Sequence, residues 1–224
     1  MDINATLQTW INVLTHPGEA TFVEEQSKPQ ATFTTAIIWM VITGVVAGIM
    51  GWLSFTLFFG SGNGFLTMLD QMNLPREVDQ QMRQMLSGGM MGMMAGGSAF
   101  SSIIMTPIFF LIGASLFYLI GRLFGGSGDL GRYAYLLASF QAPIGIIGAI
   151  LGAILGLIPV AGSCLSLILS IYGLVLTYFA TKVELNLTSG RAIAVILTPV
   201  IVFFVLIFCL VVSMFGLISS MQNQ

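Results

Sequence analysis

Hydroxyl side chains recur along one long apolar segment at spacings of three, four and seven residues, which places them on one helical face. The set is Ser163, Ser166, Ser170 and Thr177. Gln141 is the most polar residue inside another apolar segment. Together these side chains could line a polar path for a solute. We favour the alternative, in which the hydroxyls bond to their own or neighbouring helices and Gln141 satisfies backbone groups freed by Pro143.

Methionines crowd the segment 60–98 and raise the question of a soft metal ion. Met82 with Met85, and Met91 with Met93, have spacings that can bring two thioethers to one Cu(I) ion. No His or Cys lies nearby, and methionine also fills irregular apolar surfaces. Copper handling is therefore the third of three functional hypotheses for this sequence. We expect neither a metal site nor a cofactor.

Residues for catalysis do not gather in this sequence. The single histidine, His16, lies beside Pro17 and fits a solvated turn better than a general base. No Ser-His or Cys-His pair and no paired acids can be placed within the long apolar segments. Cys164 and Cys209 lie far apart in apolar segments and are expected to be small buried hydrophobes. We therefore expect that the protein is not an enzyme.

The composition is that of a membrane protein, with 56% hydrophobic and only 7% charged residues. A soluble domain has nearer a quarter of its residues charged. Charges are absent between Lys28 and Asp70, Arg83 and Arg122, Arg132 and Lys182, and after Arg191. Each stretch can hold one or two spans of about 20 residues in a lipid bilayer. No basic run suggests a nucleic-acid partner.

The apolar pattern predicts an all-α, polytopic bundle with about five transmembrane helices in a membrane domain at 31–224. The expected spans are 33–59, 99–120, 133–158, 160–181 and 192–219. We expect a kink at Pro107 and interruptions at Pro143 and Pro199. A polar excursion at 60–98 should contain a short amphipathic helix near 75–86.

Residues 1–30 are predicted to form a cytosolic segment. Residues 3–14 have helical apolar spacing but are too few to span, so Trp10 would act as an interfacial anchor at headgroup depth. Alternatively, this helix packs on the protein's own cytosolic side. Residues 19–30 are polar and acidic and are expected to form a loop.

The loop charges predict the orientation of the chain. With the N-terminus in the cytosol, the inner loops carry five Lys or Arg residues and the outer loops two, namely Lys28, Arg122, Arg132, Lys182 and Arg191 against Arg76 and Arg83. This distribution follows the positive-inside rule, so the C-terminus should lie outside.

Small residues form the strongest local pattern in the spans. The third span contains Gly145, Gly148, Gly152 and Gly156, and the first contains Gly44 and Gly48. In lipid, close backbone approach through small residues supplies the contact between helices. This face predicts either an oligomer interface or packing against the chain's own first or fourth span, and we favour the second.

Several short motifs follow one another in a recognisable order. They are an aromatic-Ala-Tyr entry at 133–135, Pro143, the Ile158–Pro159 turn, the Ile171–Tyr172 pair, and Ser189 followed by Ala192. Their order resembles the Yip-type family of Ypt/Rab-interacting membrane proteins, specifically its prokaryotic branch. The resemblance covers most of the chain and is densest from Gly131 to Val202.

The resemblance implies five spans with a cytosolic N-terminus. Eukaryotic members are associated with Rab GTPases, vesicle traffic and membrane shaping, but this chain lacks their long N-terminal domain and Asp-Leu-Tyr-Gly-Pro type motif. A GTPase partner is therefore not carried over. We predict a non-enzymatic scaffold or adaptor in a prokaryotic plasma membrane, with itself or another membrane protein as partner. The alternative is a small passive channel or permease.

Overall fold

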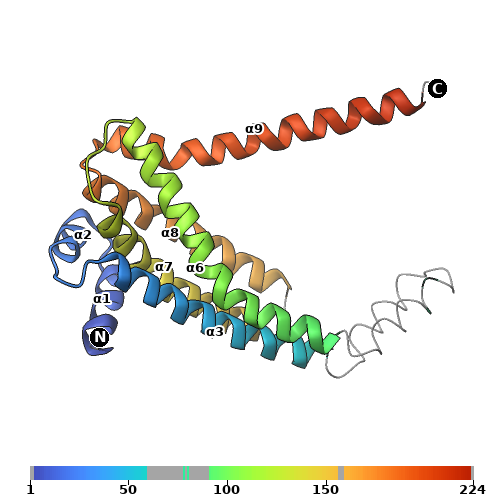
Figure 1. The fold of residues 1–224 in the computed structure, drawn as a ribbon, viewed down its shortest axis with the longest axis horizontal. Helices are drawn as coiled ribbons and strands as arrows, with labels where there is room; N and C mark the ends of the chain where they lie inside the picture. The colour runs from blue at the N-terminus through green and yellow to red at the C-terminus, as the bar shows by residue number, and fades with distance from the viewer. Residues whose placement is uncertain (1–2, 60–77, 79, 81–90, 156–158, 223–224) are drawn as a thin grey trace.

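The computed structural model describes residues 3–59, 78, 80, 91–155 and 159–222. The elements of this part are α1 (Ile3–Thr15), α2 (Glu19–Gln26), α3 (Phe33–Phe59), α6 (Met91–Leu123), α7 (Leu130–Leu155), α8 (Pro159–Glu184) and α9 (Ser189–Gln222) (Figure 1). Five of them, α3 and α6 to α9, are long and apolar enough to cross a membrane. The predicted all-α fold with five spans is confirmed.

The helix boundaries differ from the expected spans in instructive places. α6 begins at Met91, about two turns before residue 99, so residues 91–98 are helical, whereas the candidate membrane span within α6 begins at Phe100. The interruptions predicted at Pro143 and Pro199 are wrong, because α7 and α9 run through these prolines as α6 does through Pro107. In lipid no water replaces broken backbone bonds, so the helix persists around the one missing N–H. Apart from residues 78 and 80, the helix predicted near 75–86 lies outside the described residues.

Four spans form an open arc. α3 packs along both α6 and α7, and α8 packs against α7, whereas α6 and α8 meet at few points. α9 contacts α6 and α8 near its own start and then leaves the other helices (Figure 1). The arc is therefore open on the side where α6 faces α8.

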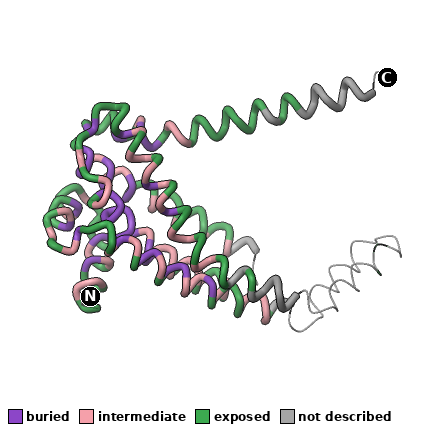
Figure 2. Tube along the Cα trace, in the orientation of Figure 1, coloured by how far each residue is buried: buried purple, intermediate pink, exposed green. Residues whose placement is uncertain are grey.

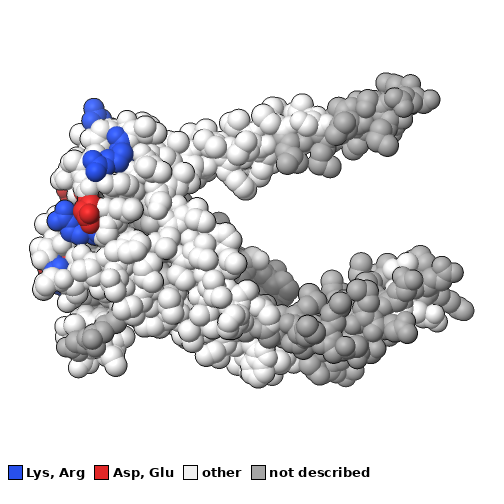
Figure 3. Space-filling view, viewed as in Figure 1, with Lys and Arg blue, Asp and Glu red and all other residues white. Residues whose placement is uncertain are grey.

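Charged side chains of the described part gather at one end of this arc, which we call the charged end (Figure 3). They lie on α2, on the last turns of α6 and α8, and on the first turns of α7 and α9 or beside them. The set is Glu19, Glu24, Glu25, Lys28, Arg122, Asp129, Arg132, Lys182, Glu184 and Arg191. Which side of the membrane this end faces stays a prediction.

The best-packed core lies next to the charged end, where buried residues concentrate (Figure 2). Its largest fully buried side chains include Trp39, Tyr133, Tyr135 and Phe140. Away from this end the helices expose mostly apolar side chains, as expected for surfaces that lipid covers. The cysteines belong to that surface: Cys164 and Cys209 are exposed, so their predicted burial is wrong. An apolar thiol facing lipid needs no cover from protein.

The two N-terminal helices pack onto this core. α2 occupies most of the predicted loop at 19–30, which is therefore wrong over those residues. Phe22 is buried, with its ring centroid 6.3 Å from those of both Phe140 and Phe179. A helix of eight residues is marginal alone, so this tertiary packing stabilises it.

Trp10 points into the core from α1. Its ring meets Trp39 edge-on, with the centroids 5.8 Å apart. These contacts match the alternative in which α1 packs on the protein itself. Three further apolar side chains of α1, namely Ile3, Leu7 and Ile11, are exposed. The position of Trp10 at headgroup depth stays a prediction.

Gly44 lies where α3 and α6 approach most closely. A Cβ atom there would lie 2.8 Å from the backbone oxygen of Ser102 and 3.1 Å from the Cα of Ile103. Gly44→Ala should therefore force the two helices apart and lower the free energy of unfolding by about 1–3 kcal/mol. Gly51→Ala is the control in the same helix, because a Cβ at Gly51 meets nothing within 4 Å. It should be neutral or stabilising by about 0.5 kcal/mol. Unfolding in mixed micelles, followed by helical circular dichroism, measures both, and equal effects would contradict the close crossing.

Candidate functional site

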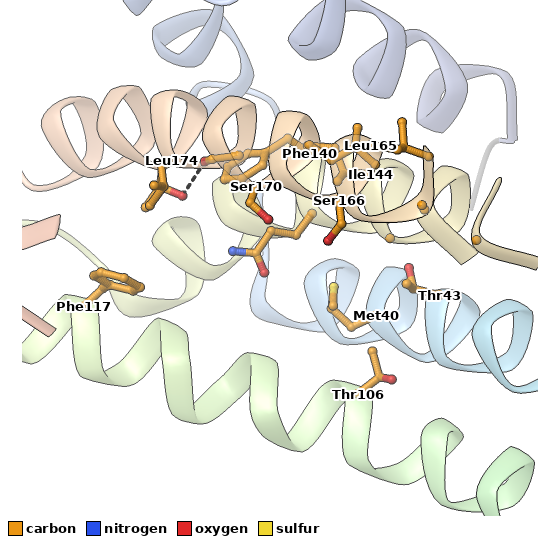
Figure 4. Close-up of a pocket in the computed structure, with 18 residues that line it drawn as sticks. Met40, Thr43, Thr106, Phe117, Phe140, Ile144, Leu165, Ser166, Ser170 and Leu174 are labelled. Carbon is orange, nitrogen blue, oxygen red and sulfur yellow. Dashed lines mark hydrogen bonds between the residues drawn. The ribbon is translucent and has the colours of Figure 1, made fainter. Parts of the chain in front are cut away.

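A cavity of about 890 Å³ lies among α3, α6, α7 and α8 (Figure 4). Residues of both predicted patterns line it: Gln141, Ser166, Ser170 and Thr177 of the polar path, and Gly145, Gly148 and Gly152 of the glycine face. Ser163 is exposed and does not line the cavity, and Gly156 lies outside the described residues. The fold thus brings the hydroxyl stripe of α8 and the glycine face of α7 together at one place.

The glycines divide into two groups by what surrounds them. A Cβ at Gly145 would lie 2.7 Å from the Cγ2 of Thr43, so this glycine permits close contact of α7 with α3. Gly48 is buried in α3, as is Gly44 at the crossing with α6. A Cβ at Gly148 would meet only Leu169, at 3.7 Å, and one at Gly152 would meet nothing within 4 Å. The second group therefore widens the cavity. A role of these glycines in an oligomer interface stays a prediction.

The polar side chains of the cavity also differ in their bonding. Thr177 donates to the Gly173 carbonyl at 2.7 Å and Thr43 to the Trp39 carbonyl at 2.9 Å, which is the expected bonding within a helix. By contrast, the side chains of Gln141, Ser166 and Ser170 have no hydrogen-bond partner within the part of the chain that the structure describes. Gln141 is half-buried, and Ser166 and Ser170 are exposed, all three within candidate membrane spans. Because a polar group without a partner in lipid costs free energy, these side chains are suited to a ligand or a solute.

Aromatic packing closes the cavity toward the charged end. Phe140 lines the cavity, and Trp39 and Tyr135 follow with ring centroids 5.1 Å apart. All three are at most 1% exposed. A polar path through this stripe stays a prediction.

A second polar arrangement lies at the charged end around Glu25, whose side chain is fully buried. Its carboxylate accepts hydrogen bonds from Thr9 at 3.1 Å and Tyr135 at 3.4 Å, and pairs with Lys28 at 2.6 Å. We call these four residues the Glu25 cluster. The cluster joins three helices, because Thr9 lies in α1, Glu25 in α2 and Tyr135 in α7. Lys28 follows the end of α2.

Glu184, also fully buried, has a similar role at the end of α8. It accepts hydrogen bonds from the Gln26 amide at 2.7 Å and the backbone N–H of Asp129 at 2.8 Å, and its Oε1 lies 3.3 Å from the Nε of Arg132. The loop before Asp129 must pass close by: a Cβ on Gly128 would overlap the backbone oxygen of Glu184. The glycine-rich loop 124–129, between α6 and α7, is thus a packed junction.

Sequence reasoning did not single out Glu25 or Glu184. The only signal was that each is an acid within three residues of a lysine that borders a long charge-free segment. Their burial depends on where α2 and the loop before α7 lie, and no spacing rule reports that.

The remaining reactive groups do not converge. His16 is exposed, and its Nδ1 lies 2.9 Å from the Oγ1 of Thr15. Among the described residues, no three His, Cys, Asp or Glu side chains are grouped as a metal site would need. Met82 and Met85 lie outside those residues, and Met91 and Met93 lie in α6 without described side chains. Copper binding by methionine stays a prediction.

Comparison with known proteins agrees with this architecture. The Yip1 domain family model matches residues 11–211, a range that takes in α2, α3, α6, α7 and α8, the end of α1 and most of α9. No curated protein and no solved structure matches the chain. With five apolar helices, the match makes this a multi-pass integral membrane protein and confirms the resemblance seen in its motifs. The chain belongs to the Yip1 domain family.

Proposed function

We propose that this chain is a non-enzymatic membrane scaffold or adaptor, which acts in membrane organisation or a trafficking-like process through contacts of its helices with other membrane proteins. The proposal rests on the exposure of the C-terminal part of α9. Every described side chain from Val200 to Ser213 is exposed, on all sides of the helix (Figure 2). This segment has no packing partner within the described chain.

The other spans differ from α9, because each places at least one face against a neighbour in the arc. In lipid, helices associate through van der Waals packing, since lipid tails are as apolar as the side chains. Phe203, Phe204 and Phe208 give α9 bulky surfaces that a partner helix can contact over many atoms. A second copy or another membrane protein is the partner that we propose. A GTPase is not part of the proposal.

Photocrosslinking in native membranes tests this proposal. A benzophenone amino acid in place of Phe204 or Phe208 should give discrete protein adducts. The control is Phe109 of α6, which is 67% exposed and equally aromatic. It should give lipid adducts and no discrete protein adduct. If the α9 positions and Phe109 give the same pattern, α9 has no dedicated partner and the scaffold proposal fails.

We further propose that the protein has no catalytic activity and no cofactor, and that it lies in a prokaryotic plasma membrane with the charged end in the cytosol. The engagement of Glu25 and Glu184 in structural contacts supports the first part. The location of Lys28, Arg122, Arg132, Lys182 and Arg191 at the charged end supports the orientation with this end in the cytosol.

A passive channel or permease is the second candidate, because polar side chains converge on the cavity. The buried aromatic residues at the charged end make it the less favoured one. Purified protein in vesicles should release ions and small solutes no faster than empty vesicles do. Flux that Gln141→Leu abolishes would reverse this ranking.

A further inference from the structure

We propose that the cavity among α3, α6, α7 and α8 binds a neutral amphiphile from the bilayer. Such a molecule has an uncharged head that forms hydrogen bonds and a hydrocarbon body, as a monoacylglycerol does. This binding is independent of the scaffold role, which rests on α9.

The head is indicated by the three unpaired side chains. The Gln141 amide both donates and accepts hydrogen bonds, and the hydroxyls of Ser166 and Ser170 do the same. In Figure 4 both hydroxyls point from α8 toward the side of α3 and α6. Other hydroxyls of the spans, including Ser54 and Thr198, bond to their own helix. A head with hydroxyl and carbonyl groups could form hydrogen bonds with Gln141, Ser166 and Ser170, which do not bond to their own helix.

The depth and charge of the cavity require that this head be neutral. Gln141 comes eleven residues after the start of α7 at Leu130, which is about 17 Å along the helix. The hydrocarbon core is about 30 Å thick, so Gln141 lies near its middle. None of the lining residues is charged. A phosphate head would lose its hydration there with no cation to pair with it.

The body is indicated by the rest of the lining and by access from the side. Met40, Ile144, Leu165 and Leu174 supply apolar walls (Figure 4). A volume of about 890 Å³ is within the range of roughly 300–1,000 Å³ typical of ligand pockets. Because α6 and α8 meet at few points, an amphiphile can enter directly from the bilayer.

The test uses the purified full chain in lipid nanodiscs with a photoreactive monoacylglycerol carrying a diazirine in its acyl chain. Mass spectrometry should locate the label on α7 and α8. Loss of two hydrogen bonds in Ser166→Ala with Ser170→Ala should lower labelling about tenfold. Gly152→Leu should abolish labelling, because its side chain occupies the cavity.

Two control variants should label as the wild type does. Ser54→Ala removes a hydroxyl that bonds to the Met50 carbonyl and does not line the cavity. Gly51→Leu adds the same bulk as Gly152→Leu at a position of α3 that does not line the cavity. Gel filtration and helical circular dichroism verify folding, and Gly152→Leu keeps the test intact if the double alanine variant fails to fold.

Unlabelled monoacylglycerol should compete with the label, and an anionic phospholipid should not. Equal competition by both, or labelling that no cavity variant changes, would overturn the proposal. So would a crosslink from Phe204 of a second copy to the cavity walls that monoacylglycerol does not displace. That last result would agree with the scaffold role and would show that α9 of a second copy occupies the cavity.

Discussion

Trp39→Ala is expected to lower the free energy of unfolding by about 3 kcal/mol, the lower end of the range for buried tryptophans. The Trp39 side chain is 1% exposed and lies between the rings of Trp10 and Tyr135, with centroids 5.8 and 5.1 Å away. In lipid the transfer term is small, because the surroundings of an exposed side chain are also apolar. The void and the lost dispersion contacts remain and account for the effect.

Trp52 provides the control for this substitution within the same helix. Its side chain is 48% exposed, on the part of α3 away from the core, so Trp52→Ala should cost less than about 1 kcal/mol. Trp39→Phe should recover much of the loss, because the Nε1 of Trp39 has no hydrogen-bond partner among the residues described. Unfolding in mixed micelles, followed by circular dichroism at helical wavelengths, avoids dependence on tryptophan fluorescence. Equal losses for Trp39→Ala and Trp52→Ala would show that the core is not centred at Trp39.

Glu25→Ala is expected to destabilise the attachment of α1 and α2 by about 2 kcal/mol while the spans stay folded. The substitution leaves Thr9, Tyr135 and Lys28 without the carboxylate that they share. The ion pair alone contributes only part of this, because Lys28 is 28% exposed and partly screened by solvent. Hydrogen exchange should therefore speed up by more than tenfold at the amides of α1 and α2.

Glu24 is a close control, because it neighbours Glu25 and lies near the same lysine. Its side chain is 64% exposed and its carboxylate lies 3.8 Å from the Nζ of Lys28. Glu24→Ala should change exchange in α1 and α2 by less than threefold. If both variants leave the two helices protected, the aromatic contacts of Phe22 and Trp10 hold them without the Glu25 cluster.

The charged end and the part of α9 beyond Pro199 therefore differ in their packing. At the charged end, the Glu25 cluster and Glu184 hold α1, α2 and the glycine-rich loop to the bundle. Beyond Pro199, α9 carries exposed surface and no described partner. The scaffold role that we propose would use both properties, because the packed end would present a constant shape and the exposed helix could associate with another protein in the membrane.

Hydropathy was sufficient to find the five spans, because the thickness of the bilayer requires about 20 apolar residues in each span, whatever their neighbours. The first span shows this well, since α3 covers the predicted residues 33–59. The charge-free stretches likewise predicted which segments enter the membrane. These properties depend on local composition, so a single sequence contains them.

The partners of each side chain depended on tertiary structure. Spacing identified the glycine face of α7 but did not separate Gly145, which packs against Thr43, from Gly152, which opens into the cavity. It placed Ser166, Ser170 and Thr177 on one face, yet only Thr177 bonds to its own helix among those three. The helix α2 and the burial of Glu25 were missed, because both require contacts with α7 more than a hundred residues away. The packing of the helices decides which gap beside a glycine is filled and which polar side chain finds a hydrogen-bond partner. Both outcomes depend on all the neighbours of a residue in space, and the local sequence pattern does not specify these neighbours.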